Sequence, residues 1–164
     1  MRPFLAAMQF LTVLPFPASW PVGEKDLARS TPWFPVVGLL IGATVAGLDY
    51  ALGLLFPRLL ASVLVVIAML AVSGGLHIDG LADTADGFLS ARPRKRVLEI
   101  MRDSRTGAMG VAAVVCIISA KIAAVSAVPG PVRWGTLLLV PLAGRCALVA
   151  TMSVLPYARP EGGL

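Results

Sequence analysis

Long runs of apolar residues alternate with short polar segments along this chain. Four of the runs reach about 20 residues, which is the length that a helix needs to cross the hydrocarbon core of a membrane. They predict membrane spans over residues 33–56, 59–76, 108–128 and 134–155. We therefore expect an all-α fold, a polytopic transmembrane helix bundle with about four spans in a single integral membrane domain over residues 1–164.

Two features refine this expectation. Pro3, Pro15 and Pro17 shorten any helix in the N-terminal stretch MRPFLAAMQFLTVLPFP, which we interpret as an interfacial or re-entrant segment kept in the mature chain. Gly38 and Gly42 in the first span are four residues apart, a spacing of small residues that lets two helices approach closely in lipid. We expect these glycines to serve helix packing.

The composition supports a membrane protein. Hydrophobic residues make up 57% of the chain and charged residues 14%, whereas a soluble domain carries about 25% charged residues. The net charge of +5 is compatible with nucleic-acid binding, but no basic face with stacking aromatic residues is visible. Basic loops on the cytoplasmic side of a membrane explain the same charge, so we expect no nucleic-acid partner.

The basic residues also predict an orientation. With four spans, ten Lys and Arg residues fall on one side of the membrane and only Arg58 and Arg133 on the other. By the positive-inside rule, the N-terminus and the segment 77–107 face the cytoplasm. The ten residues are Arg2, Lys25, Arg29, Arg92, Arg94, Lys95, Arg96, Arg102, Arg105 and Arg159.

Three aspartates gather in HIDGLADTADGF, residues 77–88, although the whole chain has only nine acidic residues. On a helix Asp79, Asp83 and Asp86 would share an arc of about 60°. Such a stripe of like charges at a membrane edge is costly, and a bound Mg²⁺ or Mn²⁺ would relieve that cost. The spacing favours a metal and phosphate site over three solvated helix-capping aspartates, while nearby glycines leave a loop open as an alternative.

Three further groups are candidates. His77 is either a hydrogen-bonding anchor or a base or phosphate contact beside the metal. The basic run RPRKR at residues 92–96 is typical of a membrane-surface anchor, whereas Arg102, Asp103, Ser104 and Arg105 could bind phosphate, with Asp103 as a fourth metal carboxylate. Within the spans, Lys121 and Arg145 could line a path for an anion or pair with Asp49.

Five blocks give the chain a family resemblance, and they occur in the expected order from residue 10 to residue 162. The chain resembles the cobalamin synthase family, the adenosylcobinamide-GDP ribazoletransferases of bacterial and archaeal vitamin B12 assembly. The pair of HIDGLADTADG and MRDSRTGAMG is the most specific part. The blocks are FLTVLPFP (10–17), WFPVVGLLIG (33–42), GGLHIDGLADTADGF (74–88), LEIMRDSRTGAMG (98–110) and LPYARPEG (155–162).

The resemblance implies an integral enzyme of the cell inner membrane that requires Mg²⁺. Members join adenosylcobinamide-GDP to α-ribazole, or to α-ribazole 5′-phosphate, and release GMP. Asp79, Asp83 and Asp86 match the aspartate motif, taken as metal ligands and, with His77, as the catalytic group. Arg102, Asp103, Ser104 and Arg105 match the family's second block, whose residues bind substrate. Glu24 is a weaker match to a position that is commonly acidic in the family, and we take it as a further substrate contact.

Two more expectations come with the resemblance. Family members continue beyond the PYARPEG segment with further spans, so we expect this chain, which ends at Leu164, to be a truncated copy or a partial gene product. The expected partners are the two substrates and the lipid bilayer, with a second copy of the chain or other corrinoid-assembly enzymes also compatible with the family.

Two rivals remain from the residues alone. A CDP-alcohol phosphatidyltransferase also uses aspartates and a divalent metal at a membrane edge, but its motif has Arg where Asp83 follows Ala82 here. A transporter or membrane scaffold would use Asp49, Lys121 and Arg145 but leaves the aspartate stripe unexplained.

Overall fold

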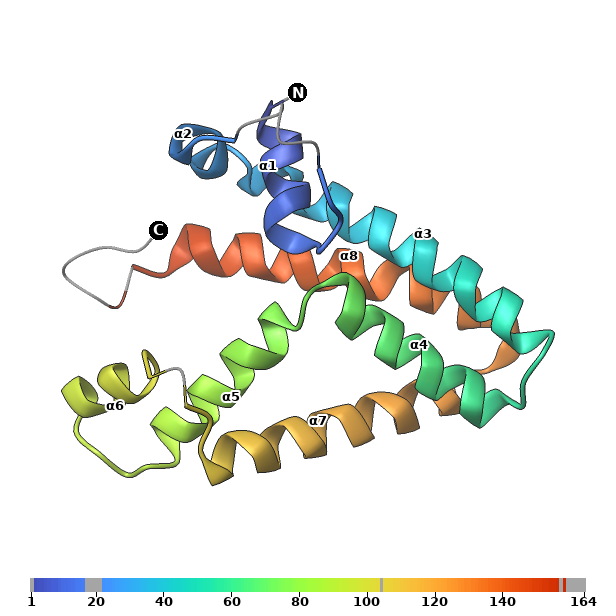
Figure 1. The fold of residues 1–164 in the computed structure, drawn as a ribbon. Helices are drawn as coiled ribbons and strands as arrows, with labels where there is room; N and C mark the ends of the chain where they lie inside the picture. The colour runs from blue at the N-terminus through green and yellow to red at the C-terminus, as the bar shows by residue number, and fades with distance from the viewer. Residues whose placement is uncertain (1, 17–21, 104, 157, 159–164) are drawn as a thin grey trace. The chain divides into compact units, whose positions relative to one another are not determined.

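A computed structural model describes residues 2–16, 22–103, 105–156 and 158 of the chain. These residues form helices and contain no β-strand, which confirms the all-α prediction (Figure 1). The elements are α1 (Arg2–Leu11), α2 (Glu24–Ala28), the 3₁₀ turn η1 (Thr31–Trp33), α3 (Phe34–Gly53), α4 (Arg58–Val72), α5 (Leu76–Phe88), α6 (Arg94–Ile100), α7 (Ala108–Ala127) and α8 (Gly130–Val154).

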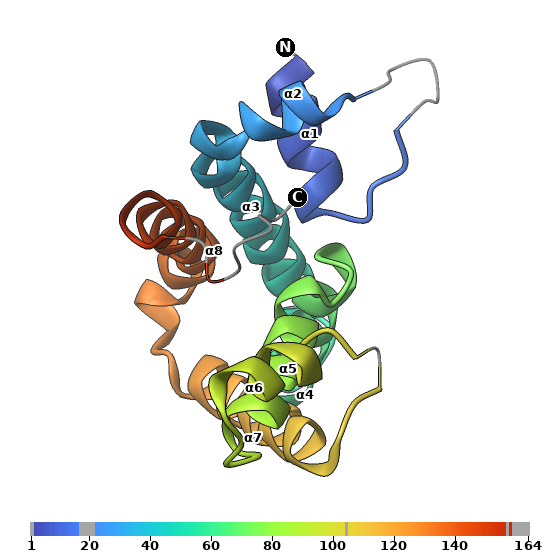
Figure 2. The same cartoon turned by 90° about the vertical axis from the view of Figure 1, so that its left-hand side faces the viewer.

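The helices belong to two compact units. The first contains α1, α2, α3 and α8, and the second contains α4 to α7 over residues 57–128. In the first unit, α3 and α8 lie side by side along much of their length (Figures 1 and 2). In the second unit, both α4 and α5 pack on α7, and α6 packs on α5.

Two glycines bring the backbones of α3 and α8 together. A Cβ built on Gly38 would lie 2.7 Å from the Pro141 carbonyl oxygen, and one built on Gly42 would collide with the Leu138 carbonyl oxygen. Because any side chain at these positions would meet backbone atoms, only glycine allows this approach. The expectation that Gly38 and Gly42 serve helix packing is confirmed.

An ion pair joins the same two helices where α3 ends and α8 begins. The Arg133 guanidinium donates to the Asp49 carboxylate through Nε at 2.8 Å and through Nη2 at 2.7 Å, and both side chains are nearly buried. Asp49 thus pairs with Arg133, and the alternative in which Lys121 or Arg145 pairs with Asp49 is wrong. A bidentate pair lowers the cost of carrying both charges into an apolar environment.

The second unit departs from the predicted span over residues 59–76. Helix α4 already ends at Val72, and the chain then bends by 88° into α5. Gly74 and Gly75 make the bend with φ angles of 60° and 72°, a left-handed conformation that glycine adopts without steric cost. The bend directs α5, with its aspartates, away from the axis of α4.

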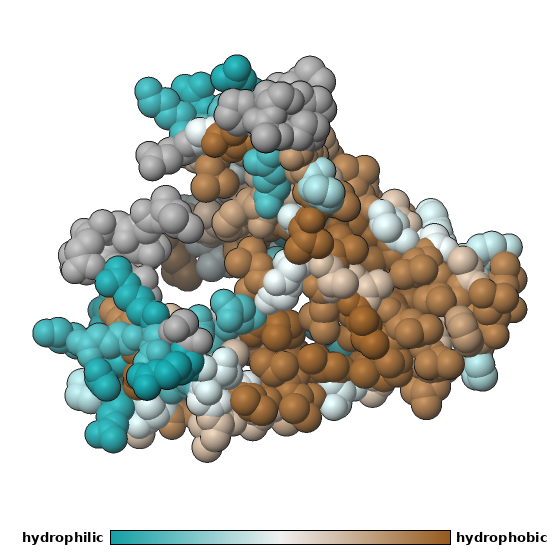
Figure 3. Space-filling model, in the orientation of Figure 1, coloured by the Kyte–Doolittle hydropathy of each residue, from teal (hydrophilic) through white to brown (hydrophobic). Residues whose placement is uncertain are grey.

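Three helices are long and apolar enough to cross a membrane: α3 together with η1, α7 and α8. The pair α4 and α5 passes the same criterion only when it is taken together across its bend. Because α5 has only 13 residues, we treat it as lying outside the spans. The space-filling view shows a hydrophobic surface over α4 and α7 and hydrophilic residues gathered at α6 (Figure 3).

The α3–α8 contact predicts opposite outcomes for two alanine substitutions in α3. Gly42→Ala should lower the stability of the folded protein by about 1–3 kcal/mol, because its Cβ collides with the backbone of α8. Gly47→Ala is the matched control, since no atom lies within 4 Å of its Cβ and alanine favours the helix. Thermal unfolding in lipid nanodiscs measures both, and equal melting temperatures for the two variants would contradict the packing.

Candidate functional site

The aspartates of the candidate site lie on one helix. Residues 76–88 form α5, so the helix is the correct alternative and the loop is not. Asp79 is exposed, while Asp83 and Asp86 are partly buried. Desolvation, followed by repulsion from Asp79 and Asp86, raises the pKa of Asp83 above its ordinary value. The repulsion of Asp83 by Asp79 and Asp86 is the one expected for three carboxylates on one face of a helix.

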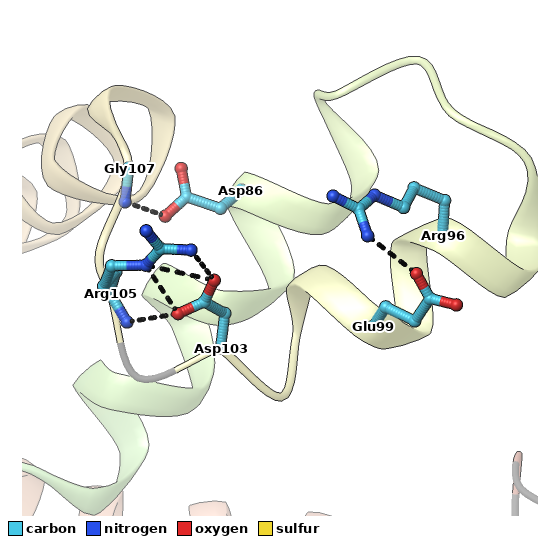
Figure 4. Close-up of polar contacts among 6 residues, drawn as sticks. All are labelled: Asp86, Arg96, Glu99, Asp103, Arg105 and Gly107. Carbon is cyan, nitrogen blue, oxygen red and sulfur yellow. Dashed lines mark hydrogen bonds and ion pairs between the residues drawn. The ribbon is translucent and has the colours of Figure 1, made fainter.

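The Asp86 carboxylate lies against the beginning of α7 (Figure 4). Its Oδ2 accepts a hydrogen bond from the Gly107 N–H at 2.6 Å, and its Oδ1 accepts one from the Gly110 N–H at 2.8 Å. These two bonds connect α5 to α7. They also bring the segment that precedes α7 next to the aspartate helix.

That segment contains a second polar cluster (Figure 4). The Arg105 guanidinium donates to both oxygens of Asp103, at distances between 2.7 and 3.2 Å, and the Arg105 N–H donates to Oδ1. These hydrogen bonds, helped by the charge of Arg105, lower the pKa of Asp103 to about 2. Asp103 is therefore ionised at any working pH and is held by Arg105.

Arginines dominate the exposed surface around this cluster. The Arg105 side chain is 87% exposed even though it pairs with Asp103, and Arg102 is exposed as well. On α6, Arg96 pairs with Glu99 at 2.8 Å (Figure 4). Guanidinium groups that remain accessible in this way can still donate to phosphate oxygens.

An open groove of about 490 Å³ runs beside Asp79, between the bend and the first turns of α7. Its polar contributions come from Asp79 and Thr106, and its other walls are apolar or backbone. Thr106, Val111 and Val114 were not singled out from the sequence. The sequence signal for a turn near the groove is the pair Gly74 and Gly75, which is typical of a turn before α5. The groove is lined by Gly74, Gly75, Leu76, Ile78, Asp79, Ala82, Thr106, Val111 and Val114.

Three other predicted site residues are Glu24, Ser104 and His77. Glu24 belongs to the other unit and its side chain is not described, and Ser104 lies outside the described residues. His77 is exposed at the first turn of α5. No three His, Cys, Asp or Glu side chains in the described part of the chain lie close enough together to hold a metal ion. The metal assignment therefore stays a prediction.

Comparison with known proteins identifies the family. The profile of the cobalamin-5-phosphate synthase family matches residues 3–164, which is nearly the whole chain. The chain belongs to this family. The resemblance seen in the five sequence blocks is thereby confirmed, and the alternative of a CDP-alcohol phosphatidyltransferase is not supported.

Individual members of the cobalamin-5-phosphate synthase family support the same conclusion. A protein of Geotalea daltonii is 41% identical over 162 residues, covering 99% of this chain and 65% of the relative. One of Desulforamulus reducens is 42% identical over 158 residues, covering 96% and 63%. Both are named adenosylcobinamide-GDP ribazoletransferase, and this chain spans slightly less than two thirds of their length. No solved structure matches the chain.

The Asp103–Arg105 pair gives a pH prediction. Arg105→Gln should raise the pKa of Asp103 from about 2 toward the usual value near 3.8, because the main hydrogen-bond donor is lost. Since the folded-state pKa lies below the unfolded value, the pair stabilises the segment above pH 3.8 and this contribution fades as the pH falls toward 2. Titration of ¹³C-labelled aspartate by NMR reads this pKa.

The matched control for this titration is Arg102→Gln, because Arg102 is not among the causes of the shift. It should leave the pKa of Asp103 near 2. An unchanged pKa in Arg105→Gln would show that the pair does not form.

Proposed function

We propose that this chain carries out the reaction named for its relatives, the joining of adenosylcobinamide-GDP and α-ribazole, or α-ribazole 5′-phosphate. The products would be adenosylcobalamin, or its 5′-phosphate, and GMP. The observation that carries the proposal is the family match over residues 3–164, which includes the aspartate helix and the arginine segment beside it. The names of the relatives supply the substrate.

The donor set at α5 fits a magnesium ion held by few protein ligands. Asp79 and Asp83 are one helical turn apart, and neither accepts a hydrogen bond from another residue in the part of the chain that the structure describes. Mg²⁺ is commonly held by one or two carboxylates together with waters and substrate phosphates. A cation there would also relieve the repulsion that raises the pKa of Asp83. When bound, it would neutralise charge on the pyrophosphate of the substrate.

Other residues of the chain would bind the substrate phosphates and accept the proton. Arg102 and Arg105 would bind phosphate oxygens, and Asp103 orients the Arg105 guanidinium through the hydrogen bonds described above. A ribazole hydroxyl would attack the phosphorus attached to cobinamide, and the bond from that phosphorus to the oxygen of GMP would break. An aspartate of α5 or His77 would take the proton of the hydroxyl. Glu24 and Ser104 remain predicted substrate contacts.

We further propose that the protein is a multi-pass protein of the cell inner membrane with α5 and α6 on the cytoplasmic side. With α4 counted as a fourth span, ten of the twelve Lys and Arg residues outside the spans predicted from the sequence lie on one side, which supports this orientation through the positive-inside rule. A site on the cytoplasmic side also fits water-soluble, nucleotide-linked substrates that reach a membrane-held enzyme. An association with a second copy, or with other corrinoid-assembly enzymes, stays a prediction of the family resemblance.

Asp83→Ala tests the proposed function. It should lower Mg²⁺-dependent release of GMP from adenosylcobinamide-GDP by at least about 100-fold, because a carboxylate that would hold the cation is lost. The assay uses this chain and, at the matching aspartate of the HIDGLADTADG block, a longer relative. Thr84→Ala is the control, since the Thr84 hydroxyl is exposed and donates only to the Gly80 carbonyl at 2.6 Å. Unchanged turnover in Asp83→Ala would refute the metal assignment.

A further inference from the structure

The first turn of α7 has no capping side chain of its own. The N-cap residue is Gly107, and the third residue of the helix is Gly110, so neither position has a side chain that could accept a hydrogen bond. The first four N–H groups of any α-helix lack a partner within the helix. A side chain that caps α7 would therefore have to come from elsewhere in the chain.

Asp86 supplies that cap from α5. In a capping box, the side chain of the N-cap residue accepts from the N–H of the third residue, and the side chain of the third residue accepts from the N–H of the N-cap. Here one carboxylate makes both bonds, to Gly107 at 2.6 Å and to Gly110 at 2.8 Å. The two aspartate oxygens thus replace two missing side chains.

The space around the carboxylate agrees with this role. A Cβ on Gly107 or on Gly110 would meet the Asp86 carboxylate, and one on Gly110 would also lie 2.9 Å from the Ala82 carbonyl oxygen. The glycines therefore leave the room that the carboxylate fills. Both are part of the block RTGAMG, so the sequence that permits the cap lies directly after Arg105.

The same location is unfavourable for a cation. The N-terminus of a helix carries roughly half a positive charge, which stabilises a carboxylate and opposes a metal ion beside it. Asp79 and Asp83 differ in that their carboxylates accept no hydrogen bond from the described residues, although Asp79 lies in the first turn of its own helix. The three aspartates of the stripe thus have different surroundings.

We propose that Asp86 is a positioning residue that caps α7 and fastens it to α5, and that it is not a ligand of the cation held by Asp79 and Asp83. The second half of this inference rests on the proposed function, whereas the first half rests on the two hydrogen bonds alone. Through the cap, Asp86 holds Arg105, two residues before Gly107, beside the aspartate helix.

Two measurements on the protein in lipid nanodiscs separate a cap from a ligand. Hydrogen exchange by mass spectrometry follows the amides of residues 107–110, and electron paramagnetic resonance follows the binding of Mn²⁺ as a probe of the cation site. Asp86→Ala should accelerate the exchange by at least tenfold and change the affinity for Mn²⁺ by less than threefold. Asp79→Asn and Asp83→Asn should each weaken Mn²⁺ binding by at least tenfold and leave the exchange unchanged.

A rescue experiment adds a readout that the loss of a metal ligand would not show. Gly107 has φ −87° and ψ 177°, the extended conformation that is typical of an N-cap residue, so an aspartate fits its backbone conformation. In the Asp86→Ala background the space beside Gly107 is vacated. The double variant Asp86→Ala with Gly107→Asp should therefore restore slow exchange at Gly110, with the new side chain as a local cap.

The outcomes decide between the two roles. Loss of Mn²⁺ binding in Asp86→Ala as large as in Asp79→Asn, or unchanged exchange at residues 107–110, would overturn the proposal. If the wild-type protein binds no Mn²⁺, the proposed metal site fails, while the exchange and rescue results still confirm or refute the cap. Should Asp86→Ala not fold, Asp86→Asn keeps one acceptor oxygen. It should accelerate exchange at residues 107–110 by a smaller factor and still change the affinity for Mn²⁺ by less than threefold.

Discussion

The hydrogen bonds between the Asp86 carboxylate and the first turn of α7 hold the candidate site together. Helix α5 carries the aspartates, and the segment before α7 carries the arginines, so neither group is placed unless the two helices are joined. The bend at Gly74 and Gly75 provides the other condition, because it turns α5 out of line with α4. The left-handed glycine pair and one carboxylate, which accepts from N–H groups 21 and 24 residues further on, thus arrange the aspartates and the arginines.

Much of the fold follows from apolar run length. The runs at 33–56, 108–128 and 134–155 predicted helices that the structure places at Phe34–Gly53, Ala108–Ala127 and Gly130–Val154. The run at 59–76 is equally apolar, but the helix ends at Val72 because the two glycines after Ser73 take positive φ angles. Hydrophobicity alone carries no information about that choice of backbone angle.

The site was predictable where it depends on spacing within one helix and not where it depends on distant partners. The stripe of Asp79, Asp83 and Asp86 follows from helical periodicity. The partners of Asp86 are backbone N–H groups 21 and 24 residues further on, which have no signature in side-chain type. The partner of Asp49 is a side chain, but Arg133 lies 84 residues away, and spacing within one helix does not reach it.

The contact of Gly38 and Gly42 with α8 has a consequence for what attracts the two helices. A glycine carries a second hydrogen in the direction where a Cβ would point, and here that direction leads to the carbonyl oxygens of Pro141 and Leu138. This is the arrangement of a Cα–H···O hydrogen bond, worth about 0.5–1 kcal/mol each. Lipid is as apolar as the side chains that it surrounds, so burial gives little attraction there. Polarised C–H groups of the backbone supply part of the adhesion instead.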